Sequence, residues 1–240
     1  MKQSWKINIT KLLVGDGIRI NPKITIYQPT IKDIAELGYG RFGSLYTVWG
    51  LTRKDLLQEE TDETWNLGDF DVYKKFVIYN EEIQKIFKDS VLFFMHQKVE
   101  FFKMQNSIFI GELESGIELT EELFSEIQSV IKQITLQKEE DEKIKNAPRS
   151  KRAQEIHDKI VQGQKRLEEI KKENGEDELA NQIVALVGHG FSYNEVFDMT
   201  LIQFKAVLEK LVQIENYNIT SLLSPYVDKK HKGKNKHWLE

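Results

Sequence analysis

The sequence predicts an α+β protein, in which an N-terminal mixed strand and helix domain is joined by a charged helical linker to a small C-terminal all-α domain. Three observations predict this class. Apolar residues alternate near the start of the chain, which is typical of strands. Apolar residues recur at helical spacing in several later segments. A run in which both charge signs are dense separates the two apolar regions.

The first region, residues 1–137, is expected to open with strands. Trp5, Ile7 and Ile9 fall on one face of an alternating pattern, as in a half-buried strand. The alternation returns after the turn Gly15-Asp16-Gly17. We therefore expect short strands on both sides of this turn.

Helix-start patterns follow these strands. Thr30 and Asp33 have the spacing of a capping box, in which the hydroxyl and the carboxylate each accept from a backbone N–H at the helix start. This pair predicts a helix over residues 31–37. Further along the region, the sequence predicts a helical stretch over 69–95, a hairpin over 98–111 and a helix that starts after Thr120.

Residues 138–178 predict a charged linker, part of it a solvated helix. Its acidic and basic residues are interspersed, which argues against a basic nucleic-acid patch. Residues 179–226 return to helical apolar periodicity and predict the small helical domain. The lysine-rich residues 227–240 predict a basic, solvated tail.

The most informative stretch lies within the helical domain and repeats one helix-start pattern. Ser192 with Glu195 forms a capping box, and Thr200 with Gln203 forms a second one. The pattern predicts a short helix that turns sharply into a longer one. No obvious catalytic group lies in this corner, which indicates binding or assembly rather than catalysis.

A DNA-binding helix-turn-helix is the main structural alternative for these helices, because their lengths are roughly suitable. The second helix would carry Glu195 and Asp198 and neither Lys nor Arg, so DNA phosphates would repel it. The net charge of −4 likewise provides no general attraction to nucleic acid. We therefore expect no nucleic-acid partner.

The segment Leu37–Gly43 resembles the glycine-rich phosphate loop of protein kinases. In a kinase this loop joins two strands, whereas here a predicted helix precedes it. No lysine follows in a suitable strand, because Lys54 lies in a polar run. We therefore interpret the segment as a glycine-bearing helix end and turn, and we expect no nucleotide or other cofactor.

Composition limits the remaining chemistry. The 240 residues include no cysteine, so thiolate metal sites and disulfides are excluded. The five histidines do not fall at metal-ligand helical spacing, and no G-x-S-x-G motif is present. No signal peptide or membrane-spanning segment is evident. We expect a soluble protein that is not an enzyme, with no catalytic residue and no metal.

Two segments carry a resemblance to a known family. The corner G-F-S-Y-N-E-V-F-D-M-T-L-I-Q-F-K-A-V-L, residues 190–208, resembles the C-terminal segment of tail assembly chaperones of phages of Gram-positive bacteria. The segment I-Y-Q-P-T-I-K-D-I, residues 26–34, resembles phage proteins encoded among tail genes. The order of the regions is also similar.

The resemblance implies a non-enzymatic assembly factor of the host bacterial cytoplasm. Such chaperones bind the long helical tape-measure protein and recruit tail tube subunits. The candidate partner-binding residues are Phe191, Phe197, Met199 and Phe204, although the same side chains could simply pack the C-terminal core. A structural virion component, such as a head–tail connector or a tail accessory protein, is the alternative. The sequence leaves a homo-oligomer open.

Overall fold

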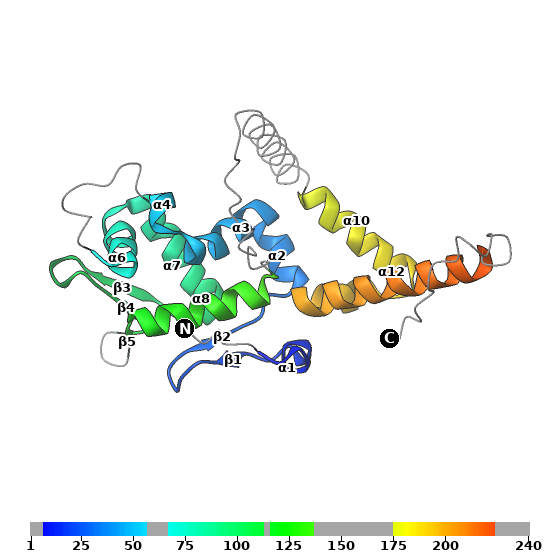
Figure 1. The fold of residues 1–240 in the computed structure, drawn as a ribbon, viewed down its shortest axis with the longest axis horizontal. Coiled ribbons are helices and arrows are strands. Elements are labelled where there is room, and N and C mark those ends of the chain that lie inside the picture. Colours follow the sequence, from blue (N-terminus) through cyan, green and yellow to red (C-terminus); the bar gives the residue numbers. More distant parts are fainter. Residues whose placement is uncertain (1–6, 57–66, 113–115, 137–174, 224–240) are drawn as a thin grey trace, which may run out of the picture.

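The computed structural model describes residues 7–56, 67–112, 116–136 and 175–223, and it confirms the α+β class. Helices surround two small antiparallel sheets, and a long C-terminal helix projects away from them (Figure 1). The first half of the described chain contains α1 (Ile9–Val14), β1 (Ile18–Arg19), β2 (Thr25–Ile26), α2 (Ile31–Leu37), α3 (Tyr39–Thr47), η1 (Val48–Gly50) and α4 (Arg53–Leu56). It continues with α6 (Asp69–Tyr79), α7 (Glu81–Met95), β3 (Val99–Phe102), η2 (Lys103–Gln105), β4 (Ser107–Ile110), β5 (Ile117–Glu118) and α8 (Glu121–Ile134). The C-terminal part contains α10 (Gly175–Gly188), α11 (Tyr193–Asp198) and α12 (Leu201–Leu223).

The strand expected around Ile7 and Ile9 is wrong, because the chain forms helix α1 there. The Asn8 side chain caps this helix by accepting from the Thr10 N–H, and Gly15 ends it with a φ of 86°. These local signals outweigh an alternation of only a few residues. The strands expected on the far side of the turn do form, as β1 and β2. Trp5 lies outside the described residues.

The predicted helix at Thr30 is confirmed, with both hydrogen bonds of its capping box to Asp33. The helical stretch expected over 69–95 forms two helices rather than one. Asn80 has an extended backbone and caps α7 by accepting from the N–H groups of Glu82 and Ile83. This side-chain cap explains the break, because Asn competes well for the backbone donors at a helix start.

The kinase-like segment forms a helix end and a second helix rather than a phosphate loop, so the predicted helix end is confirmed and the predicted turn after it is wrong. Gly38 closes α2 with a φ of 86°, as predicted for a helix end. Helix α3 then starts at Tyr39 and includes Gly40 and Gly43. The segment therefore lacks the strand–loop–strand geometry of the kinase motif.

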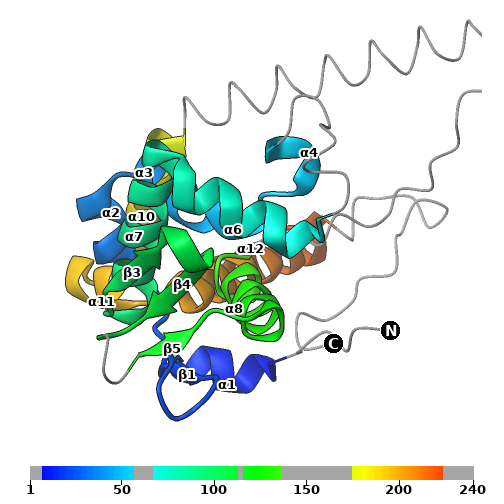
Figure 2. The ribbon, with the colours of Figure 1, turned by 90° about the vertical axis from the view of Figure 1, so that its left-hand side faces the viewer.

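The hairpin expected over 98–111 is confirmed and forms part of the three-stranded sheet β3-β4-β5. Its register pairs Phe101 with Ile108. Helix α8 begins after Thr120, as expected, and packs its apolar face into the core. Figure 2 views the molecule from the hairpin end, with α6 and α7 above the strands and α1 below them.

The core centres on aromatic side chains. Trp49 is fully buried, and its ring lies 4.9 Å from Phe87 and 5.8 Å from Phe124 between centroids. Its indole N–H donates to Ser90 Oγ at 2.7 Å, and the Ser90 hydroxyl donates to the Leu45 carbonyl oxygen at 2.7 Å. This chain of hydrogen bonds satisfies polar groups that burial would otherwise leave unpaired.

The same buried cluster includes residues from the regions predicted as separate domains, from Leu12 to Phe204. The domain boundaries themselves stay a prediction. Most of the predicted linker, residues 138–174, and all of the basic tail, residues 227–240, lie outside the described residues.

Candidate protein-interaction surface

The C-terminal helices are attached to the N-terminal region at two helix starts. Thr30 and Thr200 form an antiparallel bridge. The Ile31 N–H donates to the Met199 carbonyl oxygen at 2.9 Å, and the Leu201 N–H donates to the Pro29 carbonyl oxygen at 3.0 Å. The N-terminal caps of α2 and α12 are therefore joined by backbone hydrogen bonds, although they are far apart in sequence.

Both capping boxes of the predicted corner are present. Around α11, the Ser192 N–H donates to Glu195 Oε2 at 2.8 Å, and the Glu195 N–H donates to Ser192 Oγ at 3.3 Å. The Ser192 hydroxyl also donates to Glu195 Oε2, at 2.8 Å. The bond from the Ser192 backbone N–H and then this bond from its hydroxyl lower the pKa of the Glu195 carboxyl. At α12, the Thr200 N–H donates to Gln203 Oε1 and the Gln203 N–H donates to Thr200 Oγ1, at 2.8 and 3.3 Å.

Gln203 also connects the corner to the start of the chain. Its Nε2 donates to the Leu13 carbonyl oxygen at 2.8 Å, where α1 ends. One amide side chain thus caps α12 and holds α1 against it. The corner is consequently fixed by hydrogen bonds to α1 as well as to the Pro29–Ile31 segment.

The four predicted partner-binding residues lie mostly inward. Phe204 is fully buried, and Phe191, Phe197 and Met199 are half-buried against the core. The ring of Phe197 also stacks loosely on Tyr193, with centroids 6.4 Å apart. The structure therefore gives these residues a packing role, and their contact with a partner stays a prediction.

Helix α11, the recognition helix in the DNA-binding alternative, packs against both α10 and α2. Its Val196 side chain is fully buried in that contact region. A recognition helix needs a free face for the major groove, and the exposed face of α11 carries Glu195 and Asp198. The absence of a nucleic-acid partner therefore stays a prediction from charge.

Each of the three C-terminal helices carries exposed apolar side chains, and α12 carries two of them. Its first turn is buried through Leu201, Ile202 and Phe204, whereas Val212 and Ile219 are 53% and 55% exposed. Figure 1 shows that α12 continues well past the end of α10. The sequence predicted an apolar face on this helix, but it did not show that the face is buried only near the start of the helix. The seven-residue spacing of Val212 and Ile219 was the available signal.

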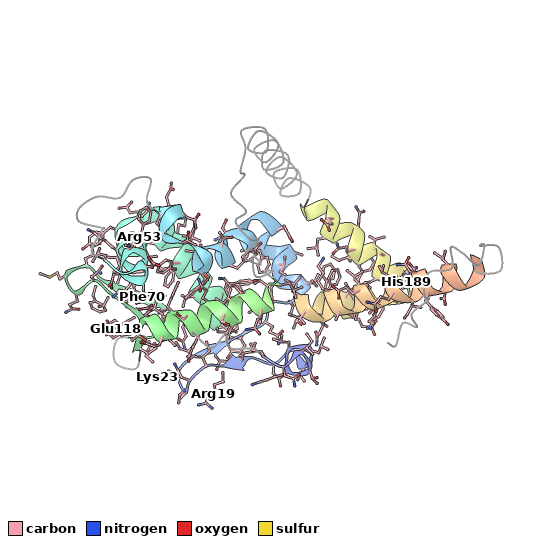
Figure 3. All side chains as sticks on the ribbon, in the orientation of Figure 1. Arg19, Lys23, Arg53, Phe70, Glu118 and His189 are labelled. Carbon is pink, nitrogen blue, oxygen red and sulfur yellow. The ribbon has the colours of Figure 1, made fainter. Side chains whose placement is uncertain are left out.

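A histidine–carboxylate pair marks the place where α10 ends beside α12 (Figure 3). His189 Nδ1 lies 2.9 Å from the Ala185 carbonyl oxygen, and Nε2 lies 2.8 Å from Glu215 Oε1. Both partners are acceptors, so they favour the imidazolium form, which donates from both nitrogens. The backbone hydrogen bond to Ala185 and then the bond to Glu215 raise the pKa of His189 above its usual 6.5.

A pocket of about 420 Å³ lies elsewhere, where the β1–β2 turn meets the three-stranded sheet. Lys23, His96 and Lys98 line it together with Glu112, so its charges are mixed. Among the described residues, no three side chains of the metal-binding types gather. Within the same residues, no helix has both the length and the apolarity needed to cross a bilayer.

The C-terminal helices match a known protein family. Residues 170–240 match the family model described as the YomV second domain, and the match contains α10, α11 and α12. It points to a phage-associated family of the YomV type. No curated protein and no solved structure matches the chain.

Proposed function

We propose that this chain is a non-enzymatic phage tail assembly chaperone, which binds the tape-measure protein and recruits tail tube subunits in the host bacterial cytoplasm. The observation that carries the proposal is the location of the YomV match. It coincides with the helical arm α10–α12, whose last helix leaves apolar side chains exposed. The narrower assignment to tail assembly draws on the resemblance of residues 190–208 and 26–34.

The exposed part of α12 has the chemistry that a helical client requires. Amphipathic helices associate through apolar residues on one face, and an uncovered apolar helix face marks an interaction site. Val212 and Ile219 meet this description in the second half of a helix that is anchored at its N-terminal end. The body of the protein then remains free to contact a second protein, such as a tube subunit.

Co-expression tests the proposal. The chain is produced with the tape-measure protein of the same phage, and the soluble complex is isolated through a tag on the chain. We expect co-purification and a gain in tape-measure solubility, because covered apolar stripes no longer aggregate. A chain that neither binds nor solubilises the tape measure would contradict the proposal. Glu100→Lys on β3 provides a surface control that should leave tape-measure binding intact, since this residue is exposed and β3 lies at the opposite end of the molecule from α12 (Figure 1).

A structural virion component is the second candidate, and the firm attachment of the arm favours it. Hydrogen bonds at Pro29, Ile31 and Leu13 hold the arm to the body, as suits a permanent connector. Mass spectrometry of purified particles separates the two functions. A chaperone should be absent from particles, whereas a connector should be present in stoichiometric amounts.

The non-enzymatic assignment has its own test. A nucleotide-dependent enzyme should melt at a higher temperature with saturating ATP and Mg²⁺, because ligand binding stabilises the native state. We expect no such rise. A clear rise in the melting temperature would contradict the assignment and would support nucleotide binding at the glycine segment Leu37–Gly43.

A further inference from the structure

Three residues of α12 share one exposed face that begins beside the end of α10. Val212, Glu215 and Ile219 follow the i, i+3, i+7 spacing that places side chains in line on a helix. Val212 and Ile219 are 53% and 55% exposed, and the Glu215 side chain is 54% exposed. A carboxylate therefore lies between two apolar side chains about one turn away on either side.

Glu215 determines which partner this face can accept. A partner that covers Val212 and Ile219 also removes water from the carboxylate between them. Desolvation of a charge is costly unless an opposite charge compensates for it. His189, at 2.8 Å, lies to one side of the carboxylate on the chain that leads from α10 to α11 and remains 37% exposed. The outward side of Glu215 thus favours a cation from the partner.

We propose that the Val212–Glu215–Ile219 face binds an amphipathic helix of another protein, in which a Lys or Arg lies between two apolar residues seven positions apart. The apolar residues pack on Val212 and Ile219, and the cation pairs with Glu215. This inference rests on the proposed function in that it describes the client helix that a chaperone of this kind would accept.

A second copy of the same chain fits this face poorly. Parallel pairing of two α12 helices in register places one Glu215 opposite the other. Antiparallel pairing of Val212 with Ile219 centres the contact between residues 215 and 216, so the two carboxylates again lie close. Like charges at a covered contact are destabilising. The charge pattern therefore favours a different, basic partner.

Synthetic helical peptides test the charge requirement directly. Two fluorescein-labelled peptides carry leucines seven positions apart and differ only in the residue between them, which is lysine in one and glutamate in the other. Binding to the full chain is measured by fluorescence anisotropy at low salt. We expect the lysine peptide to bind about tenfold more tightly, as a charge pair in a covered contact predicts.

Charge reversal on the protein supplies the decisive comparison. Glu215→Lys should reverse the preference, so that the glutamate peptide binds better. Glu209→Lys makes the same charge change about 120° from Glu215 around the helix, at the edge of the face beside Val212, and it should change the preference less than Glu215→Lys does. Val212→Ser and Ile219→Ser should weaken both peptides. Circular dichroism confirms that each variant keeps its helical content.

Several outcomes would overturn the inference. Equal affinity for the two peptides, or a lysine preference that survives Glu215→Lys, would remove the role of Glu215. Self-association that Val212→Ser abolishes in sedimentation equilibrium would identify a second copy as the occupant. Peptide binding that appears only after removal of residues 224–240 would identify that segment of the chain. A positive peptide result with no tape-measure complex would instead contradict the proposed function and leave this inference standing.

Discussion

Thr30 and Thr200 bridge one another where two capped helices begin, with Ile31 donating to Met199 and Leu201 donating to Pro29. The arrangement is nearly reciprocal, because each helix start supplies one donor and one acceptor. The hydroxyl of each threonine meanwhile accepts from its own helix, from Asp33 N–H and Gln203 N–H. Loss of order at one cap is therefore expected to affect the other helix.

The first prediction concerns this coupling. Thr200→Ala should lower the free energy of unfolding by about 1 kcal/mol, the usual cost of a lost N-cap. Because the cap of α12 is bridged to the cap of α2, the loss should also shift the unfolding of the N-terminal region. Tryptophan fluorescence, which includes the buried Trp49, and far-ultraviolet circular dichroism should report one shared urea transition. A change confined to part of the helical signal would contradict this coupling.

The second prediction concerns the buried hydrogen bonds of Trp49. Ser90→Ala removes the acceptor of the indole N–H and should cost about 1–3 kcal/mol, since a buried donor is left unpaired. Ser44→Ala is the matched control, because that exposed hydroxyl bonds only to Gly40 of its own helix among the described contacts. Urea unfolding of both variants gives the comparison. Equal small effects would show that the Trp49 bond contributes little.

The third prediction concerns pH. The folded state raises the pKa of His189, so the imidazolium form stabilises the fold at pH values below the ordinary 6.5. This contribution is lost as the pH rises through the higher folded-state pKa. His189→Asn should therefore flatten the dependence of melting temperature on pH just above 6.5. Glu215→Gln should flatten it partly, since the Ala185 carbonyl remains as an acceptor. Unchanged profiles in both variants would contradict the assignment.

The fourth prediction compares two glycines. Gly15 has a φ of 86°, and an added Cβ would lie 3.2 Å from Gln203 Nε2. Gly15→Ala should therefore destabilise the protein by about 1–2 kcal/mol through strain at a left-handed position. Gly40 lies inside α3 with open space around its Cβ position, so Gly40→Ala should stabilise by up to about 1 kcal/mol. Thermal and urea unfolding of the two variants show whether each substitution lowers or raises the free energy of unfolding.

The helix starts at Thr30, Thr120, Ser192 and Thr200 were predictable because each depends on side chains only a few residues away. A capping hydroxyl and its backbone donor are neighbours in sequence, so the signal survives without knowledge of the fold. The hairpin over 98–111 was predictable for the same reason, because its two strands and its turn are neighbours in sequence. The prediction was wrong around Ile7 and Ile9. A short alternation there indicated a strand, whereas Asn8 and Gly15 cap the two ends of a helix.

By itself, the sequence determined the fold class, the capped corner and the absence of cysteine chemistry. Tertiary structure alone decided that the corner joins Thr30, that Phe204 is buried and that Val212, Glu215 and Ile219 remain exposed. Each of these features depends on which distant segment covers a given helix face. Apolar periodicity predicts which face of a helix is suited to burial, but only the packing shows which part of that face the chain covers and which part stays exposed.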